Sequence, residues 1–588
     1  MQAPSPRFWN SLSYIGLAAA LSPALYTGCG PEFNNCEAKR TCPSTGGGGA
    51  GGSGQSGSAG TGGTLASGGS ATTAGGRNAG NSGADSAGVG GNIGPGGAPS
   101  SAGAGGSDSG EPGETETGGK AGAGFGGAPG AGGETGGGGS GGDGAAPPSC
   151  GDGAVNDPEQ CDDGNQDPAD GCRPDCTWGP KQVVAGANSS CVLFGDGSAK
   201  CWGGNSSGQL GQGDIADRGD APGELGAALK PIQINGKVAK FTALAIRSTA
   251  CGVVSGQLWC WGGNFLGEAG AGLADGKPVL LPHNIDLGET VRSVAVGFSH
   301  VCALLASGKV KCWGRADLAG NAHQQDGSVG DAPGEVGPSL AAVSLSEPAI
   351  GLVAGYNHTC ASLKSGAVAC WGENTGGKLG LGTEDSYEYG RIPPDTQPTV
   401  NLGSGTVAIQ IGLGEDHSCA LLSAQAPILK CWGRGSFGAL GYGDETSRGQ
   451  APEQLGTNLP PVPITTSSDP VAATYGLSSA TCALLSSGHV KCWGYAGPVL
   501  AQPEVVGSLD NIGDAPNELS QLTAIDLGTG AQVRSLAVGS LHACALLSTS
   551  QVKCWGLNSA GQLGIGSKED IGDARAELGD ALKAVPLE

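Results

Sequence analysis

From residue 182 to the end, the chain alternates short apolar runs with glycine-rich turns. The stretch CALLASGKVKCWG (302–314) is typical: one apolar run, a Ser-Gly turn and a second run lie between two cysteines. Alternation with a period of two, broken by Gly and Ser, predicts short β-strands joined by tight turns. Long helical periodicity is absent, so we expect an all-β fold.

This stretch occurs in seven copies, at steps of 51 to 63 residues. Each copy holds one pair of cysteines: Cys191 with Cys201, Cys251 with Cys260, Cys302 with Cys312, Cys360 with Cys370, Cys419 with Cys431, Cys482 with Cys492, and Cys544 with Cys554. A Trp-Gly follows each second cysteine, and we expect these tryptophans to pack between neighbouring units: Trp202, Trp261, Trp313, Trp371, Trp432, Trp493 and Trp555. Equal all-β units without polar end caps favour a ring of blades over a solenoid.

The spacing of the paired cysteines fits a cross-strand disulfide. In 302–314 a three-residue loop, 306–308, places Cys302 opposite Cys312, and Gly308 supplies the left-handed residue that such a loop needs. Glycine holds this place in three other units with the same spacing, and Ser550 is the exception. A two-residue turn, Ser255-Gly256, keeps the pairing in the second unit. Zinc sites and redox pairs use closer spacings, so we predict seven structural disulfides.

The two ends of the repeat region look complementary. A strand such as PIQI (231–234) or AIDL (524–527) precedes the internal units, whereas the first unit lacks one. The last residues, KAVPLE (583–588), supply a strand that no unit follows. We therefore predict that this C-terminal strand completes the first blade and closes the ring, which removes exposed sheet edges.

The first 148 residues differ in composition from the repeats. Residues 1–28 read as a signal peptide, with an apolar run from Leu12 to Leu25 that is short for a membrane span. The box before Cys29 is similar to a bacterial lipoprotein cleavage site, although Tyr26 stands where Leu is usual. We expect lipidation of Cys29; an ordinary signal peptide with Cys29 in a disulfide is the alternative. Residues 29–45 form the anchor and a short cysteine loop, and the Gly/Ser/Ala-rich linker 46–148 cannot bury a core.

Charge and cysteine content narrow the function. A net charge of −23 argues against a sequence-independent nucleic-acid binder, which needs a basic surface. The 21 cysteines leave an even number once Cys29 carries lipid, and in an exported chain an even number indicates disulfides.

A compact cassette, predicted over 149–178, separates the linker from the repeats (182–588). Its cysteines are Cys150, Cys161, Cys172 and Cys176, and the sequence does not choose among their three pairings. The pattern closely resembles the myxobacterial cysteine-rich disulfide repeat. Four of its oxygen-bearing residues could bind Ca²⁺ or could only form turns: Asp162, Asp163, Asn165 and Asp170.

The repeats themselves resemble the regulator of chromosome condensation family. The shared marks are A-x-G-x-x-H-x-x-A-L and then G-x-V-x-x-W-G-x-N-x-x-G-Q-L-G, as in 184–214 and 537–567. The resemblance implies a seven-bladed β-propeller with four antiparallel strands in each blade. The chain departs from the family pattern in the second unit, near residues 246–251. It also departs in the sixth unit, where GYAGPVLAQ (494–502) lacks the G-Q-L-G segment.

Two further sets of residues invite a chemical interpretation. Histidines precede the first cysteine of four units, and the resemblance implies inter-blade hydrogen bonds for them rather than a metal site: His300, His358, His417 and His542. An acidic segment such as GDAPGELG (219–226) recurs in four loops. Its aspartates could bind Ca²⁺ or a basic partner, or could set turns: Asp220, Asp331, Asp514 and Asp573.

No nucleophile elbow, phosphate loop or zinc motif occurs, so we expect neither catalysis nor a cofactor, with Ca²⁺ as the one candidate ligand. We expect an exported, lipid-anchored, monomeric propeller at the outer membrane or cell surface, or a secreted one. It would bind an extracellular or envelope protein or a glycan, contact the membrane only through lipid and bind no nucleic acid. Guanine-nucleotide exchange, by family analogy, and a secreted carbohydrate-binding or carbohydrate-active propeller are the alternatives.

Overall fold

The computed structural model describes residues 150–155, 159–168, 170–273, 275–320, 327–384, 398–464, 468–502 and 511–588. These residues all belong to one unit, Gly133–Glu588. The predicted signal peptide, Cys29 and the linker lie outside the described residues. Within the described part of the chain, no helix is both long and apolar enough for a membrane span.

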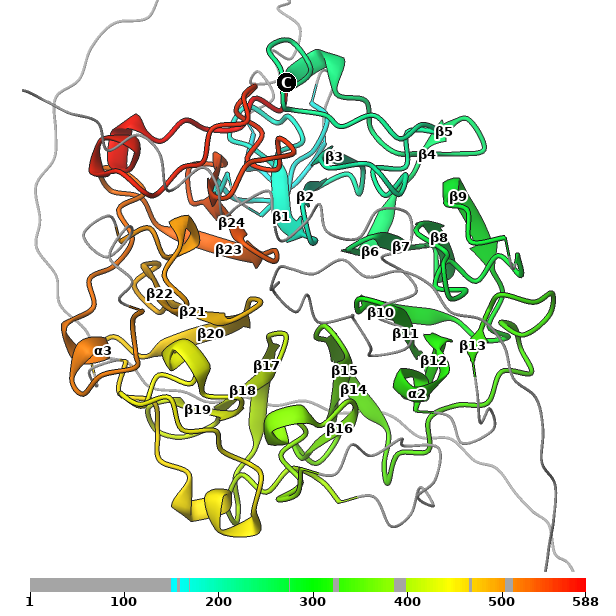
Figure 1. Cartoon of the computed structure of the whole chain (residues 1–588). Coiled ribbons are helices and arrows are strands. Elements are labelled where there is room, and N and C mark those ends of the chain that lie inside the picture. Colours follow the sequence, from blue (N-terminus) through cyan, green and yellow to red (C-terminus); the bar gives the residue numbers. More distant parts are fainter. Residues whose placement is uncertain are drawn as a thin grey trace, which may run out of the picture. The chain divides into compact units, whose positions relative to one another are not determined.

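Seven small antiparallel sheets make up the repeat region and follow one another around a ring (Figure 1). We call them blades 1 to 7 in chain order. Blade 1 is β1 (Pro180–Ala185), β2 (Ser189–Phe194) and β3 (Ala199–Gly203); blade 2 is β6 (Phe241–Ile246), β7 (Thr249–Val254), β8 (Gln257–Gly262) and β9 (Val279–Ile285); blade 3 is β10 (Val291–Val296), β11 (His300–Leu305), β12 (Val310–Arg315) and β13 (Ser328–Val329). Blade 4 is β14 (Ala349–Ala354), β15 (His358–Leu363) and β16 (Val368–Gly372); blade 5 is β17 (Ala408–Leu413), β18 (His417–Leu422) and β19 (Ile428–Gly433); blade 6 is β20 (Val471–Gly476), β21 (Ala480–Leu485) and β22 (Val490–Gly494); blade 7 is β23 (Val533–Val538), β24 (His542–Leu547) and β25 (Val552–Gly556).

Elements outside these sheets are short. The two α-helices of the described residues are single turns, α2 (Ala316–Ala319) and α3 (Glu518–Gln521), and a two-stranded hairpin joins β4 (Gln233–Ile234) to β5 (Lys237–Val238). Turns of 3-10 helix lie at Gly226–Ala228, Thr375–Gly377, Ser436–Gly438, Pro452–Gln454, Gly456–Asn458, Pro498–Leu500, Arg575–Glu577 and Gly579–Ala581. The all-β prediction is confirmed.

The outer edge of most blades is thinner than four full strands. Blades 2 and 3 have four strands, whereas the described part of the other blades has three. Four of these three-stranded blades carry an isolated bridge at the edge: Gly203–Arg218, Gly433–Arg448, Gly494–Ile512 and Gly556–Ile571. The fourth strand that the family pattern implies is thus reduced in these blades to isolated bridges.

The predicted role of the C-terminal strand is wrong. Ala584 bridges to Lys553 of β25, and the N–H of Val585 donates to the carbonyl of Val552, so these residues edge blade 7. The segment PIQI behaves in the same way, because the N–H of Ile232 donates to Ala199 of the blade that it follows. Each blade is therefore built from one contiguous stretch of chain, and no strand is exchanged between blades 1 and 7.

All seven hairpin disulfides are present as the spacing predicts. The two cysteines of each pair lie opposite each other on neighbouring strands, and their Cα atoms are 4.0–4.1 Å apart. The bonds join Cys191 to Cys201, Cys251 to Cys260, Cys302 to Cys312, Cys360 to Cys370, Cys419 to Cys431, Cys482 to Cys492, and Cys544 to Cys554. Each disulfide thus holds two strands of one blade, and none of the seven joins two blades.

The hairpin loops between the cysteines have the predicted backbone. Gly308 has φ +84° at the third loop position, where only glycine is unstrained. Ser550 takes the same left-handed conformation, with φ 64°. In the shorter hairpin of blade 2, Ser255 and Gly256 have φ 50° and 76°, as a two-residue turn of the hairpin type requires. The turn geometry therefore sets the register that brings the cysteines together.

The seven tryptophans fill the space between blades. All are completely buried, and Trp313 donates its indole N–H to the carbonyl of Glu268 in blade 2, at 2.9 Å. Equivalent bonds to the preceding blade are made by Trp202, Trp261, Trp432, Trp493 and Trp555. The predicted blade-packing role is therefore observed, and it includes the contact of blade 1 with blade 7.

Candidate functional site

The four histidines of the repeat join neighbouring blades. The Nε2 atom of His300 lies 2.7 Å from the Thr359 hydroxyl of blade 4, and that of His542 lies 2.9 Å from Ser190 of blade 1. His358 and His417 make the same bond to Ser418 and Thr481. Burial lowers the pKa of His300 to about 3 and of His417 and His542 to about 4, so all three are neutral at ordinary pH. This geometry is the structural one that the family resemblance implies.

The acidic loops are turns that a glutamate holds together. The carboxylate of Glu224 accepts the backbone N–H groups of Gly219 and Ala221, at 2.8 and 3.2 Å. Three further glutamates repeat the arrangement: Glu335, Glu518 and Glu577. The repeated segment draws attention to its aspartates, yet Asp220 is paired with Lys568 at 2.9 Å.

Asp331, Asp514 and Asp573 likewise have local neighbours, respectively Ser328, Asn511 and Glu577. Among the described residues, none of the four loop aspartates belongs to a group of side chains spaced to hold a metal ion. The turn interpretation accounts for these loops, and binding of a basic partner by them stays a prediction.

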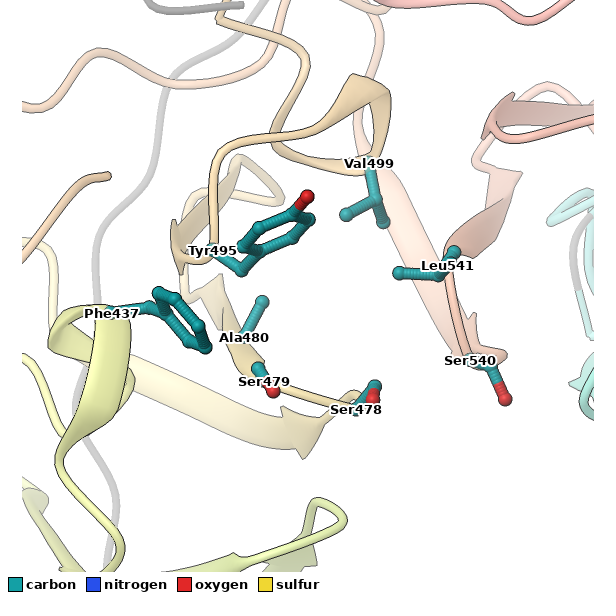
Figure 2. A pocket seen from close by; sticks show the side chains of 8 residues that line it. All are labelled: Phe437, Ser478, Ser479, Ala480, Tyr495, Val499, Ser540 and Leu541. Carbon is teal, nitrogen blue, oxygen red and sulfur yellow. The ribbon is translucent and has the colours of Figure 1, made fainter. Parts of the chain in front are cut away.

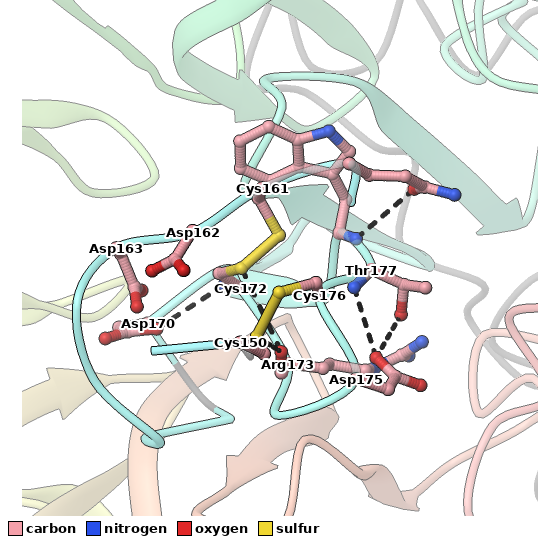
Figure 3. Close-up of a disulfide and its surroundings, with 12 residues drawn as sticks. Cys150, Cys161, Asp162, Asp163, Asp170, Cys172, Arg173, Asp175, Cys176 and Thr177 are labelled. Carbon is pink, nitrogen blue, oxygen red and sulfur yellow. Dashed lines mark hydrogen bonds between the residues drawn. A yellow bond between two sulfur atoms is a disulfide. The ribbon is translucent and has the colours of Figure 1, made fainter. Parts of the chain in front are cut away.

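The cassette is closed by two disulfides, Cys150–Cys176 and Cys161–Cys172 (Figure 3). Asp162 accepts four backbone N–H groups at 2.8–3.1 Å, and these bonds, led by that from Gly164, lower the pKa of its carboxyl. Asn165 donates to Asp170, at 3.1 Å. Both oxygens of the Asp162 carboxylate thus accept hydrogen bonds from backbone N–H groups of the turn. This arrangement favours the turn interpretation over Ca²⁺ binding.

One potential metal-binding group of the described residues also lies in the cassette, at Glu159, Asp162 and Cys176. The sulfur of Cys176 is bonded to Cys150, so it has no thiolate to offer.

The most distinctive surface lies where two units depart from the repeat. In four units a buried asparagine follows the third strand, and its side-chain oxygen accepts the N–H five residues later: Asn205, Asn264, Asn374 and Asn558. The other three units lack it: blade 3 has Ala316 at this place, blade 5 has Gly435, and blade 6 continues into GYAGPVLAQ. In these two neighbouring loops Phe437 and Tyr495 are 38% and 46% exposed.

These two aromatic rings border a hollow across blades 5, 6 and 7. Figure 2 shows Phe437 and Tyr495 on one side of it and Val499 and Leu541 on the other. The rings meet edge to face, with centroids 5.2 Å apart and planes at 72°. The hollow encloses about 180 Å³, and Ser478, Ser479, Ala480 and Ser540 complete its wall.

A second hollow adjoins the first between blades 5 and 6. It encloses about 210 Å³, shares Phe437 and Ser479 with the first, and adds Asp416 and Arg434. We call the two together the blade 5–7 groove. Phe437 has φ 62° there, a conformation that is uncommon and strained for a bulky residue. The equivalent residue of blade 4, Gly376, has the same conformation with φ 72°, so the turn requires it, and blade 5 places a phenylalanine where glycine would be unstrained.

The charged end of the groove has one more carboxylate than it has cationic groups. Asp416 pairs with Lys378 at 2.9 Å and with Arg434 at 3.0 Å. The side chain of Lys378 is only 1% exposed, and its amino group forms ion pairs with Asp416 and Glu373. Glu445 accepts the N–H of Phe437 at 3.0 Å. The rim therefore presents an excess of carboxylates beside the apolar hollow.

The sequence had located only part of this groove. The missing G-Q-L-G of unit six indicates an altered face near Tyr495, as observed. Phe437 was missed, although the loss of the asparagine in unit five could have identified it.

Family models match both regions of the described chain. Models of the regulator of chromosome condensation repeat match residues 181–209, 291–317, 350–378 and 533–562, and a second model of that repeat matches 365–421. The chain carries repeats of the regulator of chromosome condensation family. The cassette, at 146–177, matches a domain of unknown function, DUF4215.

Relatives of this repeat protein have diverse roles. It is 26% identical over 398 residues to the ultraviolet-B receptor UVR8 of Arabidopsis thaliana, covering 66% of this chain and 80% of that protein. It is 29% identical over 360 residues to the probable E3 ubiquitin-protein ligase HERC4 of Homo sapiens, where it covers 52% of this chain and only 31% of the relative. The repeats are thus shared by proteins of unlike activity.

Solved structures with similar chains include human WBSCR16, at 21% identity and a TM-score of 0.47, covering 65% of this chain and 92% of that one. Another is Prp20p of Saccharomyces cerevisiae, studied for its binding to Gsp1p and histones, at 20% identity and a TM-score of 0.45, with 61% and 80% covered.

Proposed function

We propose that this protein is an exported, lipid-anchored propeller that binds a protein partner through the blade 5–7 groove. The observation that carries the proposal is the pair of exposed aromatic side chains, Phe437 and Tyr495, at the place where two units abandon the repeat pattern. Blade 3 also lacks the loop asparagine, but there Leu318, at the position of Phe437, is buried. The meeting of two exposed rings across blades 5 and 6 is therefore best explained by something outside the blades.

The chemistry of the groove suits one kind of partner. The apolar hollow has room for a large apolar side chain, and aromatic residues in a partly enclosed site are the usual anchors of protein interfaces. The carboxylates at its charged end favour a basic residue next to that anchor. The partner that we propose is therefore a protein segment with an apolar side chain beside Lys or Arg. Protein binding is also the usual role of propellers of this family.

The buried disulfides support the proposed location outside the cytosol. Each hairpin cysteine is 0% exposed and bonded within its blade, and such bonds form and persist in oxidising compartments. An exchange factor acting on a cytosolic guanine-nucleotide-binding protein would work where thiols stay reduced. The disulfides therefore favour the surface scaffold over that alternative.

Substitutions in the groove are expected to abolish partner binding without unfolding the protein. Phe437→Gly removes the ring and also relieves its left-handed strain, so the fold should be retained or slightly stabilised. Tyr495→Ala removes the second ring. Since a central aromatic anchor is worth about 2 kcal/mol or more, each substitution should weaken binding roughly 30-fold. The partner is first identified by cross-linking on intact cells, and affinities are then measured by calorimetry.

Phe265→Ala provides the matched control, because Phe265 is an exposed aromatic residue in the corresponding loop of blade 2. Its affinity for the partner should equal that of the unmodified protein. Equal affinity in all three variants would exclude the groove as the binding site. A partner that proves to be a polysaccharide would instead support the carbohydrate-binding alternative.

Lipid anchoring is tested separately, through the lipidation of Cys29. Radiolabelled palmitate should enter the protein in its native host and should be absent from a Cys29→Ala variant, which has no thiol to acylate. Replacement of Tyr26 by leucine, the usual residue there, should leave the label in place. Absence of label from the unmodified protein would contradict lipid anchoring and leave an ordinary signal peptide.

A further inference from the structure

We infer that the cassette, residues 150–178, is a clamp that holds blade 1 to blade 7. This assigns an intramolecular role to the domain of unknown function, independent of the groove. The inference rests on the topology of the ring, on the contacts of the cassette, and on two departures from the repeat at the points of contact.

The junction of blades 1 and 7 is unlike the other six. At those six the chain itself passes from one blade into the next, whereas blade 7 ends at the C-terminal residues and shares no strand with blade 1. Only non-covalent contacts close it, such as the bond from Trp202 to the Gln562 carbonyl at 3.0 Å and from the Ser540 N–H to the Ala187 carbonyl at 3.3 Å. Opening the ring at this junction therefore breaks no peptide link.

The cassette is joined to blade 1 by backbone contacts. The N–H of Gly179 donates to the carbonyl of Gly171, and the N–H of Gly195 donates to Gly179, both at 2.9 Å. Gly195 lies in the β2–β3 hairpin turn and meets Gly171 backbone to backbone. A Cβ atom at Gly195 would lie 2.1 Å from the Gly171 oxygen, a distance that no side chain tolerates.

The same cassette reaches blade 7 through side chains. Asp167 accepts a hydrogen bond and ion pair from Arg534 of β23, at 3.0 Å. The hydroxyl of Ser550, in the β24–β25 hairpin turn, donates to the Pro168 carbonyl. Arg173 also pairs with Glu588, the last residue of the chain. The cassette thus spans the one junction that the chain does not cross.

Both hairpin turns that touch the cassette break the pattern of the other blades. The first loop residue is Gly195 in blade 1, where other blades have Ala306, Lys364, Ser486 and Ser548. The third loop residue is Ser550 in blade 7, where blades 1, 3, 4 and 6 have glycine. Each change opposes local preference, because glycine costs backbone entropy and a left-handed serine is strained. Contact with the cassette gives a reason for both.

The disulfides give the clamp its stiffness. A segment of this size buries too little apolar surface to fold alone, and cross-links usually compensate. Cys150–Cys176 joins the two ends of the cassette, and Cys161–Cys172 holds its central loop. Asp167, Pro168 and Gly171, which make the contacts, all lie on the loop between Cys161 and Cys172.

Hydrogen exchange of the full-length oxidised protein tests the clamp. In the double variant Arg534→Gln and Ser550→Gly, the Ser540 amide should exchange about tenfold faster, since an ion pair and a hydrogen bond across the junction are lost. The Ser478 amide, which donates to Ser540 across the junction of blades 6 and 7, should keep its rate. Because Ser550→Gly relieves strain in its own turn, general destabilisation would not produce this pattern.

Two further variants complete the test. Arg292→Gln alters the same position of β10, in the matching sequence Val-Arg-Ser of blade 3, and should change neither amide. Cys161→Ser with Cys172→Ser should accelerate Ser540 as the double variant does. An unchanged rate at Ser540 in the contact and cysteine variants, or an equal increase at Ser478, would overturn the clamp.

Discussion

Replacement of Trp313 by alanine is expected to destabilise the propeller by about 3–5 kcal/mol, the usual cost of emptying a buried tryptophan site. The side chain is 0% exposed and lies between blades 2 and 3. Its truncation leaves a cavity and also leaves the Glu268 carbonyl without its 2.9 Å donor. A Cβ atom on Gly270 would come within 3.3 Å of the Trp313 indole nitrogen, so the space is filled on the side of blade 2.

Urea unfolding monitored by circular dichroism measures this loss. Trp313→Phe keeps most of the volume and should lose less, and Phe265→Ala, at a ring 58% exposed, should stay within about 0.5 kcal/mol of the unmodified protein. A cost below about 1 kcal/mol for Trp313→Ala would mean that the tryptophans do not hold the blades together.

Stability is also expected to fall as the pH drops from about 6.5 to about 4. Burial, the largest cause, depresses the pKa of His300 to about 3 and of His417 and His542 to about 4, and it lowers that of His358 well below its usual value. In the unfolded chain these imidazoles take up protons near pH 6.5, whereas the folded protein binds them only at lower pH. Acid therefore favours unfolding, and the stabilisation is complete only above pH 6.5.

A single-histidine variant isolates the effect. Each proton that the unfolded chain binds and the folded protein does not changes the free energy of unfolding by about 1.4 kcal/mol per pH unit. His417→Gln should therefore reduce this dependence between pH 6 and pH 5 by about that amount. Carboxylates with lowered pKa values, such as Asp214 and Asp444, titrate below this window. The free energy of unfolding at pH 7, 6 and 5 gives the slope; identical slopes in both proteins would show that His417 titrates normally in the fold.

Short-range features were accessible from the sequence because neighbouring residues determine them. The position of Gly308 fixes a three-residue turn, and that turn alone brings Cys302 opposite Cys312. The closer pair of Cys251 and Cys260 follows from the two-residue turn of blade 2 in the same way. Six hairpins follow this local rule, and the seventh, with Cys419 and Cys431, keeps the pairing around a five-residue loop.

Longer-range features were not accessible. An apolar run between two units can edge either neighbour, so the sequence did not show that Ala584 pairs with blade 7. The four cassette cysteines can pair in three ways, and the local sequence is compatible with each of them. Only the folded structure identifies the bonds as Cys150–Cys176 and Cys161–Cys172. Lys311 was overlooked: its amino group is buried and donates to three loop carbonyls at 2.7–3.3 Å, although a lysine before the second cysteine recurs along the chain.

Ser550 illustrates how an exception gains meaning from the structure. Within its own hairpin it is only a poor substitute for glycine. In the folded chain its hydroxyl meets the cassette, which the sequence places far away. Phe437 is similar. The turn of blade 5 requires a left-handed residue, as Gly376 shows in blade 4, but the choice of phenylalanine gains a reason only when Tyr495 of blade 6 is beside it.

The central claim is that partner binding lies in the groove where the repeat pattern is abandoned. A photo-cross-linking amino acid placed at Ser436, within the groove, tests it most directly when compared with the same label at Ser206, the corresponding residue of blade 1. On intact cells, Ser436 should give one discrete protein adduct that disappears with Tyr495→Ala, and Ser206 should give none. The same adducts from both positions, or an adduct that survives Tyr495→Ala, would contradict the account.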